Sequence, residues 1–183
     1  MTEMAHTSSL ITLAEKAKKL KLLILDVDGV LTDGKLFFDN QGNEYKSFHA
    51  RDGHGIKLLR QTGVEVAVIS GRKSNSVALR MKNLGIELVY QGHEDKRAAF
   101  NEIIAKLGIT PEQAAHIGDD LLDLPIMTRV GLAIAVADAN FAVKQRADWC
   151  TTLPGGYGAV REVCDFIMQA QGRFDEVLSA YLK

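Results

Sequence analysis

Cysteine is scarce in this chain: Cys150 and Cys164 are the only two among 183 residues. They form no CxxC pair, so neither a disulfide framework nor a thiolate metal site is expected. We therefore predict a reducing compartment, the cytoplasm, and two cysteines that serve as small core residues.

An excess of charge of either sign is also missing, because 22 basic side chains are balanced by 23 acidic ones. This balance argues against nucleic acid or an anionic membrane as the main partner. Residues 1–20 are polar and include Glu15, Lys16 and Lys18, so they lack the apolar centre of a signal peptide. No apolar run approaches the length of a membrane span.

What the chain does contain is a regular alternation of short apolar runs with helix-like stretches. Helices are predicted from Ser8 or Ser9 to Leu20, over 56–61, 74–84 and 95–107, and near the C-terminus. Strands are predicted over 22–25, 64–69, 86–90, 114–118 and 131–136. This alternation predicts an α/β fold, a doubly wound, Rossmann-like parallel sheet with helices on both faces. We expect residues 1–183 to form a single domain.

An aromatic-rich segment over about 35–48 interrupts this alternation after the first strand. Lys35–Asp39 and Glu44–Phe48 are strand-like and flank a turn that contains Gly42, which predicts a β-hairpin insertion. A two-stranded hairpin is marginal alone, and this one carries Phe37 and Phe38. We therefore expect it to pack on a partner subunit.

The first strand ends in Asp26 and Asp28, which Gly29 follows. Residues two apart on a strand project to the same side. Here that side lies at the carboxyl edge, where open α/β sheets bind ligands. Two carboxylates in one crevice repel, so the site calls for a cation. The alternative is a plain turn, because Asp and Gly are ordinary turn residues.

Two further strands end in polar residues, Ser70-Gly71-Arg72 and Asp119-Asp120. Carboxyl ends of neighbouring parallel strands meet at one edge, and Lys96, opening a predicted helix, can reach the same crevice. Hard oxygen ligands suit Mg²⁺, whereas a hydroxyl, a lysine and free backbone N–H groups suit a phosphate. A carboxylate nucleophile that forms an aspartyl-phosphate fits this inventory.

Together these motifs resemble those of the haloacid dehalogenase superfamily of phosphatases. The resemblance rests on Asp26-Val27-Asp28-Gly29, Ile69-Ser70-Gly71-Arg72, Lys96 and Gly118-Asp119-Asp120, which span most of the chain in the expected order. Any one of these motifs alone would be a weak signal.

The resemblance implies a role for each of these polar residues. Asp26 would attack phosphorus, and Asp28 would act first as general acid and then as general base. Ser70 and Lys96 would hold the phosphoryl oxygens. Mg²⁺ would be held by Asp26, by Asp28 through its backbone carbonyl, and by Asp119. Asp123 either supports the metal or Lys96 from behind or is a surface or first-turn helix acid; the role of Asp120 is left open.

Neither the stretch from Asp26 to Val64 nor that from Ser70 to Asp119 leaves room for a cap domain. The chain thereby resembles the small, lidless branch that acts on sugar-acid phosphates, in which hairpins assemble a homotetramer and a neighbour covers each site. The branch implies a phosphorylated octulosonic- or nonulosonic-type substrate and a role in making the inner sugar of lipopolysaccharide. A sialic-acid-like 9-phosphate is the alternative substrate, and a non-catalytic sugar-phosphate-binding module is the alternative to an enzyme.

The branch also implies a set of substrate contacts. Guanidinium groups pair with carboxylate and phosphate alike, which suits a substrate that carries both. Arg80 could equally lie on a solvated helix face. The contacts would fall on Asp28, His49, Ala50, Arg51, Asp52, Gly53, Lys57, Arg72, Arg80 and Lys96.

The C-terminal tail, about 153–183, begins with a glycine-rich segment that includes Gly155, Gly156 and Gly158. Three glycines before a helix predict a mobile loop with exposed backbone. In the branch this tail reaches a neighbouring site and helps to release product. The alternative is a plain turn that starts the helix.

Overall fold

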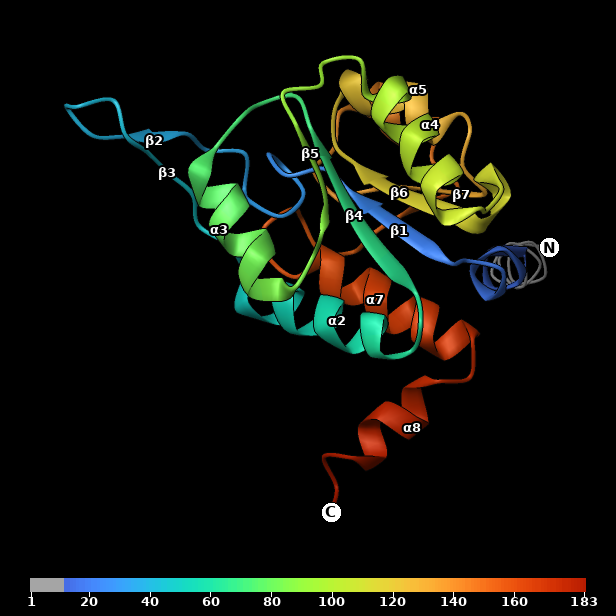
Figure 1. The fold of residues 1–183 in the computed structure, drawn as a ribbon. Helices are drawn as coiled ribbons and strands as arrows, with labels where there is room; N and C mark the ends of the chain where they lie inside the picture. Colours follow the sequence, from blue (N-terminus) through green and yellow to red (C-terminus); the bar gives the residue numbers. More distant parts are fainter. Residues whose placement is uncertain (1–11) are drawn as a thin grey trace.

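A six-stranded, wholly parallel sheet forms the centre of the computed structural model, which describes residues 12–183. The strand order is β5-β4-β1-β6-β7-β8, so β1 lies between β4 and β6 (Figure 1). The doubly wound sheet predicted from the sequence is confirmed. The strands are β1 (Leu22–Leu25), β4 (Glu65–Ser70), β5 (Leu88–Gln91), β6 (Ala114–Gly118), β7 (Leu132–Ala135) and β8 (Trp149–Cys150).

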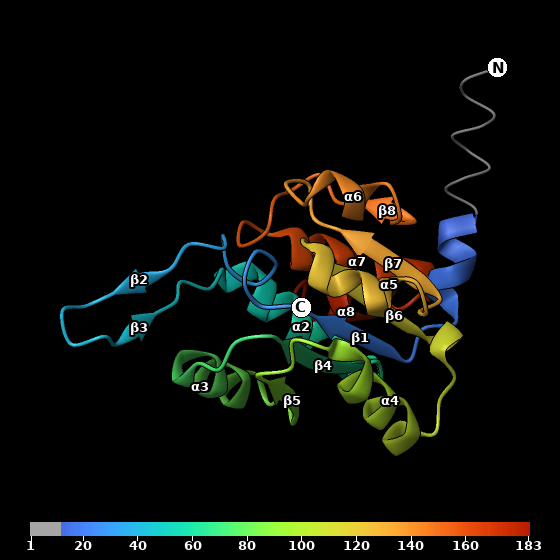
Figure 2. The same ribbon diagram turned by 90° about the horizontal axis from the view of Figure 1, so that it is seen from above.

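Helices cover both faces of the sheet (Figures 1 and 2). On one face lie α2 (Ala50–Gln61) and α7 (Ala159–Ala170), while α4 (Lys96–Leu107) covers the other. None of the helices within residues 12–183 has the length and apolar character that a membrane crossing requires. The remaining elements are α3 (Asn75–Leu84), η1 (Pro111–Gln113), η2 (Leu121–Asp123), α5 (Leu124–Met127), α6 (Phe141–Lys144) and α8 (Phe174–Ser179).

Strand β1 is fully buried because its alternate side chains enter two different apolar clusters. Leu23 and Leu25 pack toward α2 and α7, whereas Leu22 and Ile24 pack toward α4. All four are 0% exposed, and fully burying such a side chain stabilises the fold by about 1.5–3 kcal/mol. The strand that carries the site is therefore held in the middle of the core.

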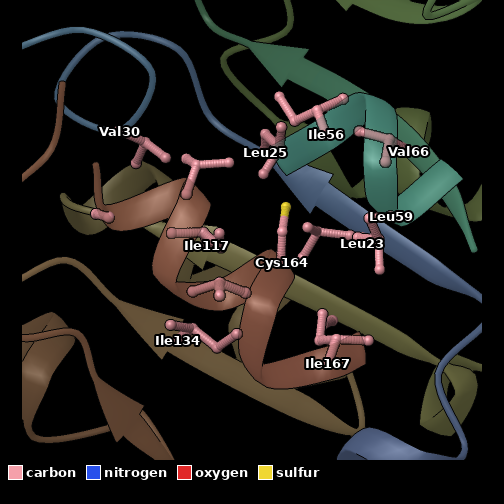
Figure 3. Close-up of a cluster of buried hydrophobic side chains, with 14 of the residues drawn as sticks. Leu23, Leu25, Val30, Ile56, Leu59, Val66, Ile117, Ile134, Cys164 and Ile167 are labelled. Atoms are coloured by element: carbon pink, nitrogen blue, oxygen red, sulfur yellow. The ribbon is translucent and has the colours of Figure 1, made fainter. Parts of the chain in front are cut away.

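Cys164 of α7 lies in the same core, beside Leu23 and Ile117 in Figure 3. Burial raises the pKa of its thiol, which leaves it an unreactive packing residue as predicted. The same prediction is wrong for Cys150, whose side chain is exposed. It sits on β8, the edge strand, which pairs with β7 on one side only.

Helix α2 begins six residues earlier than the sequence predicted. The segment 50–55, expected to be a glycine-rich loop, is helical, and the His49 side chain caps it by accepting a hydrogen bond from the Arg51 N–H. Its glycines permit close packing: a Cβ on Gly55 would press on Arg161 and Cys164 of α7. Glycine here serves helix–helix approach and does not break the helix.

The predicted hairpin is present but short, with β2 (Phe37–Phe38) paired antiparallel to β3 (Glu44–Tyr45). It projects away from the body of the molecule (Figures 1 and 2). Phe37, Phe38 and Tyr45 are at least half exposed, at 50%, 56% and 56%.

The ends of the chain differ from the prediction in two ways. Residues 12–18 are helical, as predicted, while the proposed caps Ser8 and Ser9 lie outside the described residues. At the other end two helices, α7 and α8, replace the single one expected.

The glycine-rich segment before α7 is a turn that leads into the helix, the second of the two possibilities, and Gly155 and Gly158 are buried rather than exposed. The Gly156 N–H donates to the Val30 carbonyl at 2.9 Å. A Cβ on Gly155 would overlap the Gly29 carbonyl, so only glycine permits this contact. The segment packs behind the loop that follows β1.

Candidate active site

The carboxyl ends of β1, β4 and β6 bring polar residues from distant parts of the chain to one cavity of about 180 Å³. This follows from the parallel register, in which Leu25 pairs with Val68 on one side and with Ile117 on the other. The residues that line the cavity are Asp26, Asp28, Ser70, Gly71, Arg72, Lys96, Asp119, Asp120, Leu122 and Asp123.

Lys96 is the central cation of this cavity and is only 1% exposed. Its Nζ donates to Asp26 Oδ1 and to Asp123 Oδ1, each at 2.7 Å. The side chain enters from the first turn of α4, which Asp95 caps by accepting from the Arg97 N–H at 3.1 Å. The cap fixes where the helix starts and therefore where Lys96 points.

Asp123 fixes the conformation of the loop after β6 through hydrogen bonds to the backbone of that loop. Its Oδ2 accepts hydrogen bonds from the backbone N–H groups of Asp119, at 2.9 Å, and Asp120, at 3.2 Å. Its Oδ1 shares a hydrogen bond of 2.8 Å with His116 Nε2. Asp123 is 1% exposed, so it is not the surface acid that was one of the two possibilities. Sequence reasoning missed His116, although a histidine within an apolar strand was a usable signal.

Three carboxylates in one buried cluster perturb one another's ionisation. Burial raises the pKa of Asp119 to about 8, and the charge of Asp26 adds to this shift. Burial and the charge of Asp123 also raise the pKa of Asp26. Burial opposes the charge of Asp123 too, but the hydrogen bond with His116 and the charge of Lys96 outweigh it and hold its pKa low. Lys96 alone does not balance this negative charge.

The cluster fits a magnesium ion. Asp26, Asp119 and Asp123 each offer a carboxylate oxygen, and these atoms lie within 4.8 Å of one another. Oxygen donors of this kind are the ligands that Mg²⁺ takes in proteins, with water filling the other positions. The excess negative charge supplies the attraction. Both oxygens of Asp123 are occupied, Oδ1 by Lys96 and His116 and Oδ2 by two backbone N–H groups, so Asp26 and Asp119 are the carboxylates best placed to reach an ion.

We predict that Mg²⁺ binding weakens about tenfold for each pH unit between 8 and about 6, because the ion must displace the proton of Asp119, and more steeply below 6, where Asp26 also takes up a proton. The raised pKa also means that the Asp119 contribution to metal-free stability is present at low pH and is lost as pH rises through 8. Melting temperatures measured with chelator and with Mg²⁺, each at pH 6 and pH 8.5, test the predicted pH dependence of metal binding and of metal-free stability. The stabilisation by Mg²⁺ should be larger at pH 8.5, and Asp119→Asn should remove the difference. An equal shift at both pH values would contradict the prediction.

Asp28 is held by the root of the hairpin. Its Oδ1 accepts a hydrogen bond from Lys46 Nζ, and its Oδ2 lies 3.7 Å from Arg72 Nε. Glu44 pairs with both cations, at 2.7 Å to Lys46 and 2.9 Å to Arg72. The sequence interpretation missed Glu44 and Lys46; their two-residue spacing on a strand, with opposite charges on one side, was the available signal.

Of the ten predicted substrate contacts, Asp28, Arg72 and Lys96 line the cavity. The exposed Ala50, Arg51 and Lys57 and the capping His49 lie on or beside α2 instead. The remaining three have structural contacts: the buried Asp52 accepts from the Arg161 N–H at 2.8 Å, and Arg80 lies over Gly53 and 5.9 Å from the Phe48 ring.

Comparison with known proteins agrees with this geometry. Residues 87–154 match the model of the haloacid dehalogenase-like hydrolases. The chain is 51% identical over 161 residues to the 3-deoxy-D-manno-octulosonate 8-phosphate phosphatase KdsC of Escherichia coli K12, covering 88% of this chain and 86% of that one. The chain belongs to the haloacid dehalogenase-like hydrolases.

Solved structures of other haloacid dehalogenase-like hydrolases superpose closely on this one. The 3-deoxy-D-manno-octulosonate 8-phosphate phosphatase of Yersinia pestis gives a TM-score of 0.89 at 46% identity, over 90% of this chain and 89% of that one. The enzyme of the same name from Moraxella catarrhalis, in complex with a magnesium ion, a phosphate ion and KDO, gives 0.90 at 41% identity, over 92% and 97%. The chain therefore shares the fold of this family over nearly its whole length, with no cap domain among the described residues.

Proposed function

We propose that this protein is a Mg²⁺-dependent phosphatase that hydrolyses 3-deoxy-D-manno-octulosonate 8-phosphate to the free sugar acid and phosphate, a step of lipopolysaccharide biosynthesis. The observation that carries the proposal is the position of Lys96, which joins Asp26 to Asp123 inside the cavity that also contains Ser70 and Asp119. The identity of 51% to the Escherichia coli enzyme supports the choice of substrate.

In the proposed reaction the chain supplies the nucleophile, the acid–base and the oxygen ligands. An Asp26 oxygen attacks phosphorus as the bond from phosphorus to the sugar oxygen breaks, and that oxygen takes a proton from Asp28. Water then attacks the phosphorus of the aspartyl-phosphate and returns a proton to Asp28, which frees Asp26. Ser70 and Lys96 hold the phosphoryl oxygens and offset their charge.

Asp26, Asp119 and the backbone carbonyl of Asp28 are the groups that would hold Mg²⁺. The ion, when bound, polarises a phosphoryl oxygen and lowers the repulsion between the phosphate and the attacking carboxylate. Without it, Asp26, Asp119 and Asp123 would confront an incoming phosphate with more negative charge than Lys96 offsets.

A panel of phosphorylated sugars tests the proposed substrate. We expect phosphate release to be fastest, by kcat/KM, with 3-deoxy-D-manno-octulosonate 8-phosphate in the presence of Mg²⁺, and to stop when a chelator is added. Faster release from a sialic-acid-like 9-phosphate would move the assignment to that substrate. If no phosphate monoester were hydrolysed with Mg²⁺ present, a non-catalytic binding module would replace the enzyme.

The proposal extends to assembly and compartment. A homotetramer built by the hairpins is supported by the exposure of Phe37, Phe38 and Tyr45 on a projecting two-stranded element. Light scattering should give four times the chain mass, and Phe37→Ser together with Phe38→Ser should lower it.

The unpaired state of Cys150 and Cys164 supports a reducing compartment, the cytoplasm.

A further inference from the structure

Lys46 is a charged residue whose side chain is buried, although it belongs neither to the apolar core nor to the solvent-exposed surface. It follows directly after β3 at the root of the hairpin, and its side chain is 1% exposed. A buried ammonium group is expensive unless it is paired, and here its partners are the carboxylates of Asp28 and Glu44. The ammonium group of Lys46, at the root of the hairpin, therefore contacts Asp28, the residue proposed as the general acid and base.

Glu44 fixes Lys46 on the body of the protein. One oxygen of Glu44 pairs with Lys46 at 2.7 Å, and the other accepts from Arg72 Nη2 at 2.9 Å. The backbone carbonyl of Glu44 accepts a hydrogen bond of 3.3 Å from Ser76 Oγ on α3. Lys46 thus extends from a base attached to both the β4 loop and α3, and it has little freedom to follow Asp28 if that side chain turns.

The two oxygens of Asp28 are consequently unequal. Oδ1 accepts the hydrogen bond from Lys46, whereas Oδ2 lies 3.7 Å from Arg72 Nε, beyond hydrogen-bond distance. A carboxylate that transfers a proton needs one oxygen free to face the reacting atom. With Oδ1 occupied, Oδ2 is the oxygen that can exchange the proton.

We propose that Lys46 is a positioning residue that holds Asp28 by Oδ1 and so directs Oδ2 toward the leaving oxygen of the substrate. This inference rests on the proposed function, since it needs Asp28 to be the general acid. The leaving oxygen receives its proton from Oδ2 as its bond to phosphorus breaks, and the water proton returns to the same oxygen in the second step. Lys46 transfers no proton itself.

Substrates with different leaving groups separate a positioning role of Lys46 from a purely structural one, because a structural defect would lower kcat/KM for all of them alike. Formation of the aspartyl-phosphate determines kcat/KM, and proton donation matters in that step only when the leaving oxygen is strongly basic. A nitrophenolate is weakly basic and leaves without receiving a proton, whereas a sugar alkoxide is strongly basic and needs one. A misdirected Asp28 should therefore slow sugar phosphates far more than p-nitrophenyl phosphate.

We expect Lys46→Met to lower kcat/KM for the sugar phosphate by about 10- to 100-fold, and for p-nitrophenyl phosphate by less than about threefold. Across a series of aryl phosphates the variant should depend more steeply on leaving-group basicity than the wild type. Lys46→Arg, which keeps a cation at this position after β3, should recover part of the loss. Lys35→Met is the matched control on the same hairpin, since Lys35 is 65% exposed and pairs with Asp33, and it should change neither rate.

A double-mutant cycle with Asp28→Asn completes the test. If Lys46 acts through Asp28, adding Lys46→Met to Asp28→Asn should cause no further loss of kcat/KM for the sugar phosphate, the substrate on which Lys46→Met alone shows its effect. Equal losses on both substrates, or a full additional loss in the Asp28→Asn background, would overturn the inference. Lys46→Gln enters the same comparison if melting shows that the Met variant is unfolded. Absence of phosphatase activity in the wild type would instead overturn the proposed function, so the two failures are distinguishable.

Discussion

Replacement of Asp26 by asparagine is expected to lower kcat by about 10⁴-fold or more while the fold persists. An amide oxygen is a poor nucleophile, so the covalent intermediate cannot form at a useful rate. Substrate binding should survive, because Ser70, Arg72 and Lys96 remain in place. Phosphate release under single-turnover conditions, together with trapping of labelled phosphate on the protein, measures the effect.

The melting temperature of Asp26→Asn distinguishes the loss of the nucleophile from a general disruption of the fold around the site. Burial and the charge of Asp123 raise the pKa of Asp26, so its negative charge is unfavourable in the metal-free protein. Asp26→Asn should therefore melt at or above the wild-type temperature when chelator is present. Asp175→Asn, an exposed change on α8, is the matched control and should leave both turnover and melting unchanged. Turnover by Asp26→Asn within tenfold of wild type would remove Asp26 as the nucleophile.

Replacement of Lys96 by methionine is expected to harm both stability and turnover. The change leaves Asp26 and Asp123 buried without their shared cation, which costs about 3–5 kcal/mol in the free energy of unfolding. It also removes a donor to the phosphoryl oxygens, which should lower kcat by about 10²- to 10³-fold. Chemical denaturation in chelator and steady-state assays in Mg²⁺ measure the two effects separately.

Mg²⁺ should restore part of the stability of Lys96→Met, because the ion also neutralises Asp26. It should not restore turnover, since an ion held by Asp26 and Asp119 would not replace a donor that enters the cavity from α4. Lys106→Met is the matched control, being an exposed lysine on the same helix. Full recovery of kcat at high Mg²⁺ would mean that Lys96 contributes only charge balance.

Most of the sheet could be predicted from the sequence because its central strands are short, largely apolar and followed by glycine or aspartate. Leu22–Leu25 and Ala114–Gly118 are such runs, and the structure places both as buried strands. The start of α2 could not be predicted in the same way. Gly53 and Gly55 weaken a helix locally, and only the packing of α2 against α7 and Arg80 shows why glycine is required there.

Several polar residues of the cavity could be predicted for the same reason, since Asp26 and Asp119 directly follow strands and Ser70 ends one at the carboxyl edge. The contacts that support them could not. His116 and Lys46 reach Asp123 and Asp28 through tertiary folding, and no periodicity in the sequence pairs them. The predicted contacts on α2, such as Arg51 and Lys57, stay predictions, because these side chains lie outside the lining of the cavity.

The contact between Gly155–Gly156 and the loop after β1 joins segments that a ribosome makes far apart in time. Asp26 emerges early, yet the strand β6 beside it and the glycines behind its loop come much later in synthesis. A nascent chain therefore lacks the support behind the Asp26 loop until Gly155 and Gly156 have been made. We infer that a polypeptide truncated before Gly155 is inert, so premature termination yields no stray hydrolytic activity.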